Sequence, residues 1–227
     1  MEFQRARRPE QVEQRRRAIL GAARALLRER PLADISLREL SCRVGLAKSN
    51  VLRYFDSREA VFLEVLDAER GAWLDALETA LEAVPQTAPG TGAPADRDPV
   101  AVATAVASSL AGRRTLGELL GGAGALERNI TADTARRSTS RADAHAARLA
   151  ALVRARLPVL DEAAARHFAD VAVAVAAGLW PRADPTEAVA AALRESGAAE
   201  PAEAFATALT EALVNHLVGL VARSGGN

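Results

Sequence analysis

Four polar side chains lie close together in the stretch GLAKSNVLRYFDSREAV, residues 45–61, and their types suit contacts with the edges of DNA bases. The amide of Asn50 can pair bidentately with adenine, the cations Lys48 and Arg53 can address guanine, and Ser49 can donate or accept. Each good pair of this kind is worth roughly 1–3 kcal/mol of discrimination against a wrong base. These residue types therefore point to base reading, provided that one helix presents all four on the same side.

A helical wheel separates this stretch into two faces, because an α-helix advances about 100° per residue. Ala47, Val51 and Phe55 fall on one face, which we expect to be buried. The outward face holds the four polar residues Lys48, Ser49, Asn50 and Arg53, with Lys48 near the boundary. The alternative is that Lys48 and Arg53 are ordinary solvated charges and that Tyr54 is a core residue.

The helices that must position this face can be predicted from the residues that begin and end them. A first helix is expected over residues 12–30, stopped by Pro31. Ser36 and Glu39 form a capping box that opens a second helix, which ends near Gly45. A third helix over 47–55 and a fourth from residue 56 or 57 to 82 or 83 follow. Two short helices joined through a glycine, with a long helix on each side, are typical of a helix-turn-helix, whose second short helix enters the major groove.

Phosphate contacts are expected around this reading face. A phenol or a guanidinium beside it can hold phosphate oxygens, and the start of the second helix offers backbone N–H groups. The residues predicted for this role are Ser36, Arg38, Tyr54 and Arg58.

Charge is unevenly distributed along the 227 residues, although the net charge is +0. Residues 1–60 hold 14 Lys+Arg against 8 Asp+Glu, whereas residues 61–227 hold 15 against 21. A basic module beside an acidic body indicates a polyanionic partner at one end only. The single cysteine, Cys42, cannot form an internal disulfide, and no leader or membrane-spanning run is apparent, so we expect a cytoplasmic protein.

The remaining chain predicts an all-α fold, because alanine is abundant and apolar residues recur at helical spacing. Helices are expected near 99–112, 115–121, 131–156, 161–179 and 201–223, with a short helix inside 181–201 and a proline-rich loop over 84–99. The run DVAVAVAAG, residues 170–178, alternates like a strand, but its alanines and helical flanks favour a buried helix.

Residues 15–63 resemble the N-terminal domain of the TetR family of bacterial transcriptional regulators. The motifs that carry the resemblance are ILGAARALL, ISLREL, VGLAKSNVLRYF and SREAVF. Three positions depart from the family pattern: Pro31, Ala47 and Leu52 stand where Gly, Ser or Thr, and Tyr are frequent. Ala47 cannot cap the reading helix through its side chain, and Leu52 cannot donate a hydrogen bond. The operator sequence is therefore not transferable from a relative.

The resemblance implies a three-helix helix-turn-helix domain over residues 1–57, ordered from about residue 12, and a larger helical ligand-binding and dimerisation domain over 58–227. It implies a homodimer on double-stranded operator DNA, most simply a repressor released by a small effector, with no cofactor or metal. The predicted interface comprises Phe168, Val171, Val175, Leu179, Phe205, Leu209, Leu213, Leu217 and Leu220. Candidate ligand contacts are Trp73, Leu77, Leu126, Asn129, Ile130 and Phe168.

Several alternatives stay open at this level. Both apolar stripes can serve the monomer core alone, as can each candidate ligand contact. The same fold can also be controlled without a small molecule. An unrelated helical enzyme is the remaining reading, but His145, His167 and His216 are scattered over three predicted helices and no metal-binding or nucleophile motif accompanies them. With aromatic residues scarce, any ligand cavity is expected to be lined by aliphatic side chains and to favour a largely apolar ligand.

Overall fold

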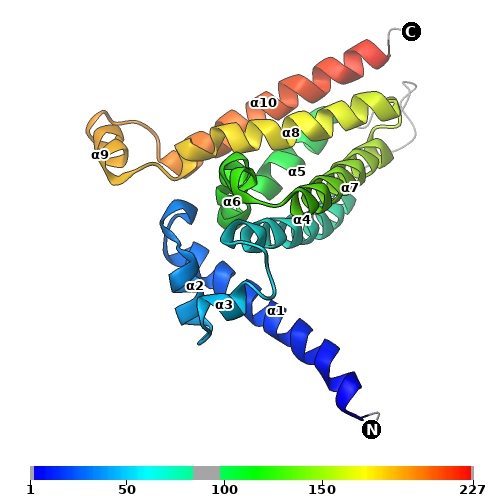
Figure 1. Ribbon diagram of the computed structural model, residues 1–227. Helices are drawn as coiled ribbons and strands as arrows, with labels where there is room; N and C mark the ends of the chain where they lie inside the picture. The colour runs from blue at the N-terminus through cyan, green and yellow to red at the C-terminus, as the bar shows by residue number, and fades with distance from the viewer. Residues whose placement is uncertain (1–2, 84–97, 226–227) are drawn as a thin grey trace. The chain divides into compact units, whose positions relative to one another are not determined.

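The computed structural model describes residues 3–83 and 98–225, and the regular structure of these residues is entirely helical (Figure 1). This confirms the predicted all-α class. In chain order the elements are α1 (Phe3–Glu29), η1 (Leu32–Asp34), α2 (Leu37–Arg43), α3 (Lys48–Val51), α4 (Arg58–Glu82), α5 (Pro99–Ala111), α6 (Arg114–Leu126), η2 (Glu127–Asn129), α7 (Ala132–Arg156), α8 (Glu162–Ala183), α9 (Glu187–Glu195) and α10 (Pro201–Ser224).

The local stop and start signals were read correctly at most helix ends. The capping box of α2 is present, with Ser36 and Glu39 bonded reciprocally, and Gly45 adopts φ 66° in the turn that follows. The alternating Val and Ala run lies within α8 and is helical. The helix α1 begins earlier than residue 12, and residues 84–97 of the predicted loop lie outside the described residues.

The chain divides into two compact units. Unit 1 comprises Met1–Glu69 and Gly122–Arg141, and unit 2 comprises Arg70–Gly121 and Ala142–Asn227. The three helices α4, α6 and α7 each continue from one unit into the other. The division therefore falls inside these helices, and the boundary after residue 57 stays a prediction.

Unit 1 is built around the apolar faces of the first four helices. Ile19 and Ala23 of α1, Leu40 of α2, Val51 of α3 and Val61 of α4 are all inaccessible or nearly so. Burying each of the valine, leucine and isoleucine side chains contributes roughly 1.5–3 kcal/mol. This common core fixes α2 and α3 against the two long helices and so determines which side of α3 remains exposed.

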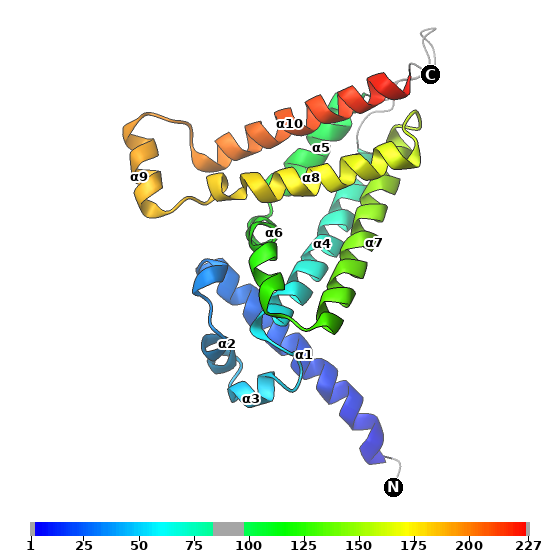
Figure 2. The same ribbon diagram turned by 45° about the horizontal axis from the view of Figure 1, so that its top comes forward.

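In unit 2, α10 lies alongside both α5 and α8, as Figures 1 and 2 show. The indole of Trp180 on α8 packs over Gly117 of α6, where a Cβ atom would lie 2.1 Å from the ring, and its Nε1 donates to Glu118 at 3.1 Å. Trp73 of α4 is also buried and donates to Ser109 of α5 at 2.9 Å. These contacts close a tightly packed helical core.

By length and mean hydropathy, α10 alone among the helices of the described residues would be long and apolar enough to cross a membrane. Its strongest apolar stripe is instead buried against neighbouring helices. Phe205, Leu209, Leu213, Leu217 and Leu220 are each no more than 5 % exposed.

Candidate nucleic-acid interface

The short helix α3 presents the polar surface that the helical wheel predicted, but Ala47, which the wheel placed on the buried face, is exposed at the start of the helix. Lys48, Ser49, Asn50 and Arg53 are exposed, whereas Val51 and Phe55 are buried. Regular α-helix ends at Val51, but backbone bonds from Tyr54 N and Phe55 N to the carbonyl of Val51 continue the turn to the end of the segment. The polar residues are therefore carried on residues 48–55, called the reading segment from here on. The buried face of this segment is anchored in unit 1.

Two positions that depart from the family pattern behave as expected. No side chain caps the start of α3 at Ala47, so the first N–H groups of this helix receive no side-chain acceptor there. Leu52 is 45 % exposed and lies on the same segment as the polar residues. An exposed leucine at this place can contact a thymine methyl group.

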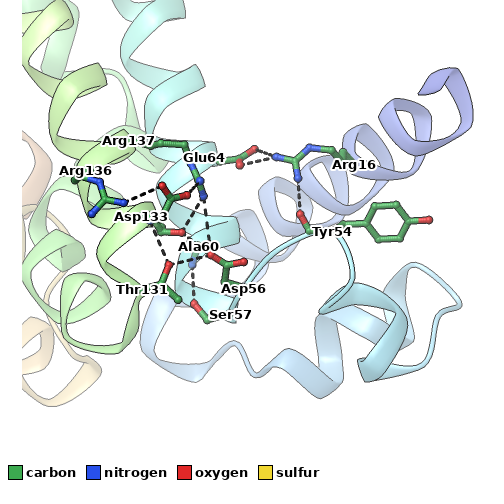
Figure 3. A network of polar contacts seen from close by, with 11 residues as sticks. Arg16, Tyr54, Asp56, Ser57, Ala60, Glu64, Thr131, Asp133, Arg136 and Arg137 are labelled. Carbon is green, nitrogen blue, oxygen red and sulfur yellow. Dashed lines mark hydrogen bonds and ion pairs between the residues drawn. The ribbon is translucent and has the colours of Figure 1, made fainter. Parts of the chain in front are cut away.

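The end of the reading segment is tied to α1 and α4 through Arg16. Its guanidinium donates to the backbone carbonyl of Tyr54 and pairs with both oxygens of Glu64 at 2.5 Å (Figure 3). It also lies 4.3 Å from the ring centroid of Phe55, a cation–π contact. The Tyr54 ring points away from this network and is half-buried, so its phenol remains a candidate phosphate ligand. Sequence reasoning missed Arg16, because nothing distinguishes it from Arg15 and Arg17 beside it.

Arg58, which the sequence predicted as a phosphate contact, is instead engaged by protein partners. Its side chain is only 19 % exposed, donates to the carbonyls of Leu32 and Ile35, and pairs with Glu59 at 3.2 Å. Leu32 begins η1 and Ile35 directly follows it, so the guanidinium at the start of α4 bonds to the backbone at both ends of this short turn. Arg58 therefore fastens α4 to the segment before α2.

The start of α2 is exposed at both predicted positions. The hydroxyl of Ser36 is already engaged with Glu39, from whose backbone N–H it accepts at 3.2 Å, so it serves first as a helix cap. Arg38 is exposed and remains available for an anion.

Asp56 connects the end of the reading segment to the start of α7. Its Oδ2 accepts hydrogen bonds from Thr134 at 2.8 Å and from Thr131 at 3.0 Å, and Arg137 lies 3.9 Å away (Figure 3). These hydroxyl donors, Thr134 first, hold the pKa of the Asp56 carboxyl below its usual value. No sequence signal pointed to this contact, because its partners are far apart along the chain.

A polar cleft of about 360 Å³ lies within unit 1 beside these contacts. Its walls include Arg16 of α1, Glu64 of α4, and Arg137 and Arg141 of α7, each of which takes part in an ion pair. A cleft so charged does not suit the apolar ligand that the composition favoured.

The six candidate ligand contacts are divided between the two units. Trp73, Leu77 and Phe168 are fully buried in the core of unit 2, whereas Leu126, Asn129 and Ile130 belong to unit 1, where Asn129 is exposed. Their assignment to a ligand stays a prediction, because core and cavity linings have the same composition.

An apolar groove of about 440 Å³ in unit 2 is a better candidate for a ligand. It lies around α9, and its walls are Pro181, Arg182, Pro185, Val189, Leu193, Ala198, Ala199, Pro201 and Ala204. This volume is within the range of small-molecule sites. Since α9 has no buried residue of its own, the groove is open to solvent.

Most of the predicted dimer interface lies in the core of one chain. Six of its residues are at most 5 % exposed and cannot contact a second copy: Phe168, Phe205, Leu209, Leu213, Leu217 and Leu220. That part of the prediction is wrong, because the most apolar stripe of each helix faces the monomer. Val171, Val175 and Leu179 of α8 are half-buried, and Val218 of α10 is 38 % exposed.

Comparisons with known proteins place this geometry in a family. Residues 19–65 match the model described as bacterial regulatory proteins, tetR family, and residues 67–224 match the tetracyclin repressor-like C-terminal domain. The HTH-type transcriptional regulator EthR of Mycobacterium tuberculosis is 48 % identical over 50 residues, 22 % of this chain and 23 % of that protein. The sequence match thus spans about a quarter of that relative.

Two solved structures share the fold over most of their length. The TetR family repressor AlkX from Dietzia sp. strain DQ12-45-1b aligns with a TM-score of 0.50 at 16 % identity, covering 91 % of this chain and 96 % of that one. The regulator FadR from Bacillus subtilis aligns with a TM-score of 0.51 at 14 % identity, covering 88 % and 97 %. Because the two family models together match from within α1 to the end of α10, the chain belongs to the TetR family of transcriptional regulators.

Proposed function

We propose that this regulator reads its operator through Lys48, Ser49, Asn50 and Arg53 of the α3 segment, inserted into the major groove. The observation that carries the proposal is the division of faces, with these polar side chains exposed and Val51 and Phe55 buried. Tyr54 and Arg38 flank this surface and are assigned to phosphate oxygens, as is the exposed start of α2 at Ser36. Operator affinity then combines base pairing with a salt-dependent backbone contribution.

A small, largely apolar ligand in unit 2 is proposed to relieve operator binding, so that the protein acts as a repressor in the cytoplasm. The groove around α9 supports this proposal by its volume and its aliphatic and proline walls. The structure of the related FadR contains stearoyl-CoA. Acyl compounds are therefore a suitable first class of ligands to test. Ligand and DNA would favour different conformations and weaken each other reciprocally.

A homodimer is proposed through the faces of α8 and α10 that the monomer leaves exposed. Ala174 and Gly178 of α8 and Val218 of α10 are exposed, and Val171 and Val175 beside them are half-buried. Small residues let helices approach closely, so this surface suits a second copy. Two reading segments then meet half-sites about one helical turn, roughly 34 Å, apart.

Control without a small-molecule ligand, by a protein partner or by abundance alone, is the alternative. An enzymatic role is the remaining alternative, and the two family matches favour DNA-binding regulation over it. Titration of the chain with a series of acyl ligands separates the two forms of control. Binding that lowers operator affinity supports the ligand-relieved repressor, and ligands without effect on operator affinity support the alternative.

Selection of bound DNA from a random pool tests the operator proposal. The selected sequences are expected to contain two inverted half-sites. Asn50→Ala and Arg53→Ala should each relax base preference at one position of the half-site, at a cost of about 1–3 kcal/mol. A uniform loss of affinity on every sequence would assign both residues to phosphate contacts and contradict their base-reading role.

A further inference from the structure

The reading segment ends at a carboxylate whose two hydroxyl donors both come from the start of α7. Thr134 and Thr131 donate to the same oxygen of Asp56, at 2.8 and 3.0 Å. Asp56 follows directly on Phe55, the buried end of the reading segment, and precedes Ser57, whose hydroxyl accepts from the N–H of Ala60 and caps α4. The carboxylate therefore occupies the junction between the reading segment and α4.

Both hydroxyls are fixed in orientation by a second bond. Thr131 accepts from the backbone N–H of Thr134 at 3.2 Å, which makes it the cap of α7. Thr134 is 6 % exposed and accepts from Arg137 at 3.0 Å. Each hydroxyl oxygen thus accepts one hydrogen bond and donates its proton to Asp56. The contact is thus preorganised by α7 itself (Figure 3).

The helix that carries these donors does not end in unit 1. Its residues 132–141 belong to unit 1, and the helix then continues to Arg156 in unit 2. The helix α4, which begins at Arg58, likewise continues into unit 2. The reading segment is accordingly connected to unit 2 covalently through α4 and non-covalently through Asp56 and α7.

We propose that Asp56 is a positioning residue for operator binding, which holds the end of the reading segment on the start of α7 and makes DNA affinity depend on that helix. In this arrangement a movement of α7 relative to α4 acts on the segment directly, without requiring α4 to bend. The inference rests on the proposed operator contacts of α3. Its link to an effector rests on the proposed ligand control as well.

A competing explanation predicts the opposite sign. If Asp56 is only an exposed anion near the DNA, its removal relieves repulsion of the phosphates and strengthens binding to all sequences. If Asp56 positions the reading segment, its removal leaves residues 52–57 less ordered in the free protein. Part of the free energy of operator binding is then spent on ordering these residues. Affinity for the operator then falls. Asp56→Ala separates the two explanations by the direction of the change alone.

The experiment measures dissociation constants for the selected operator and for a scrambled duplex, on full-length protein. Asp56→Ala should weaken operator binding about five- to ten-fold, the effect of one or two charge-assisted hydrogen bonds at a half-exposed site. Thr134→Val, which changes no charge, should produce a smaller loss in the same direction. The double variant should be no weaker than Asp56→Ala, because both changes remove one interaction. Thr134→Ser keeps the hydroxyl and should restore wild-type affinity.

The matched control is the neighbouring pair of Arg141 on α7 with Asp67 on α4, 3.1 Å apart. This pair joins α7 to α4, and neither partner belongs to the reading segment. Arg141→Gln should change operator affinity by less than about two-fold. Hydrogen exchange at residues 52–57 should quicken in Asp56→Ala and Thr134→Val but not in the control. Unchanged or tighter operator binding by Asp56→Ala overturns the inference. Failure of the wild-type chain to select any operator instead refutes the proposed function.

Discussion

Replacing Arg58 by alanine tests the division between structural and DNA-contacting cations. The guanidinium bonds to the carbonyls of Leu32 and Ile35, pairs with Glu59, and lies 5.0 Å from the ring centroid of Phe62, with 19 % of its side chain exposed. Its removal takes a charged donor from two carbonyls, of which that of Leu32 still accepts from the backbone N–H of Ile35 at 3.3 Å. Each such loss costs about 1–3 kcal/mol, so we expect a destabilisation of about 3 kcal/mol.

Thermal unfolding measures this cost directly. For a chain of this length, 1 kcal/mol corresponds to a shift of about 2–4 °C, so Arg58→Ala should lower the Tm by about 6–12 °C. The dependence of operator affinity on salt should keep its slope, measured well below the Tm, because no phosphate contact is lost. Arg53→Ala is the matched control, since this exposed cation should leave the Tm unchanged while weakening operator binding.

The opposite pattern would refute the structural assignment of Arg58. A Tm unchanged to within about 1 °C, together with a salt slope reduced by about one, is the signature of a phosphate contact. Arg58→Lys refines the test, because the ammonium group of lysine lacks the planar set of donors by which the guanidinium bonds to both carbonyls. An intermediate Tm for this variant is expected.

The remaining predictions concern unit 2. The ring centroids of His216 and His167 lie 5.1 Å apart. Burial, and after it the charges of His167 and Arg223, lower the pKa of His216 below the ordinary 6.5. The neutral form is favoured on folding, so stability is fully present above about pH 6.5 and falls as the pH drops from there toward the folded pKa. Denaturant unfolding of His216→Asn should show a shallower decline between pH 7 and 5, and an unchanged decline would exclude this group. Leu213→Asp places a charge in the core and should unfold unit 2. Val218→Asp should keep its helicity, measured by circular dichroism, and should dissociate the proposed dimer in sedimentation. A folded Leu213→Asp monomer would contradict the core placement of Leu213.

Much of the helix-turn-helix could be predicted from the sequence because its signals are local. The capping box at Ser36, the left-handed turn at Gly45 and the polar face of residues 48–53 each depend on neighbours within one or two helical turns. Periodicity also placed the helices of unit 2, including the one that alternates like a strand. These features follow from backbone geometry and side-chain spacing, which a sequence displays directly.

Only the tertiary structure decided which partner each long-range side chain meets. Arg58 and Arg53 look alike in the sequence, yet one bonds to buried carbonyls and the other is exposed. The apolar stripe of α10 was predicted to form a dimer interface, with the monomer core as the alternative. In the structure this stripe is buried where α10 packs against α5 and α8. Asp56 and Thr134 meet only because α4 and α7 lie together in unit 1. Such pairings depend on how helices pack, and the identity of a residue does not encode the distance to a partner far along the chain.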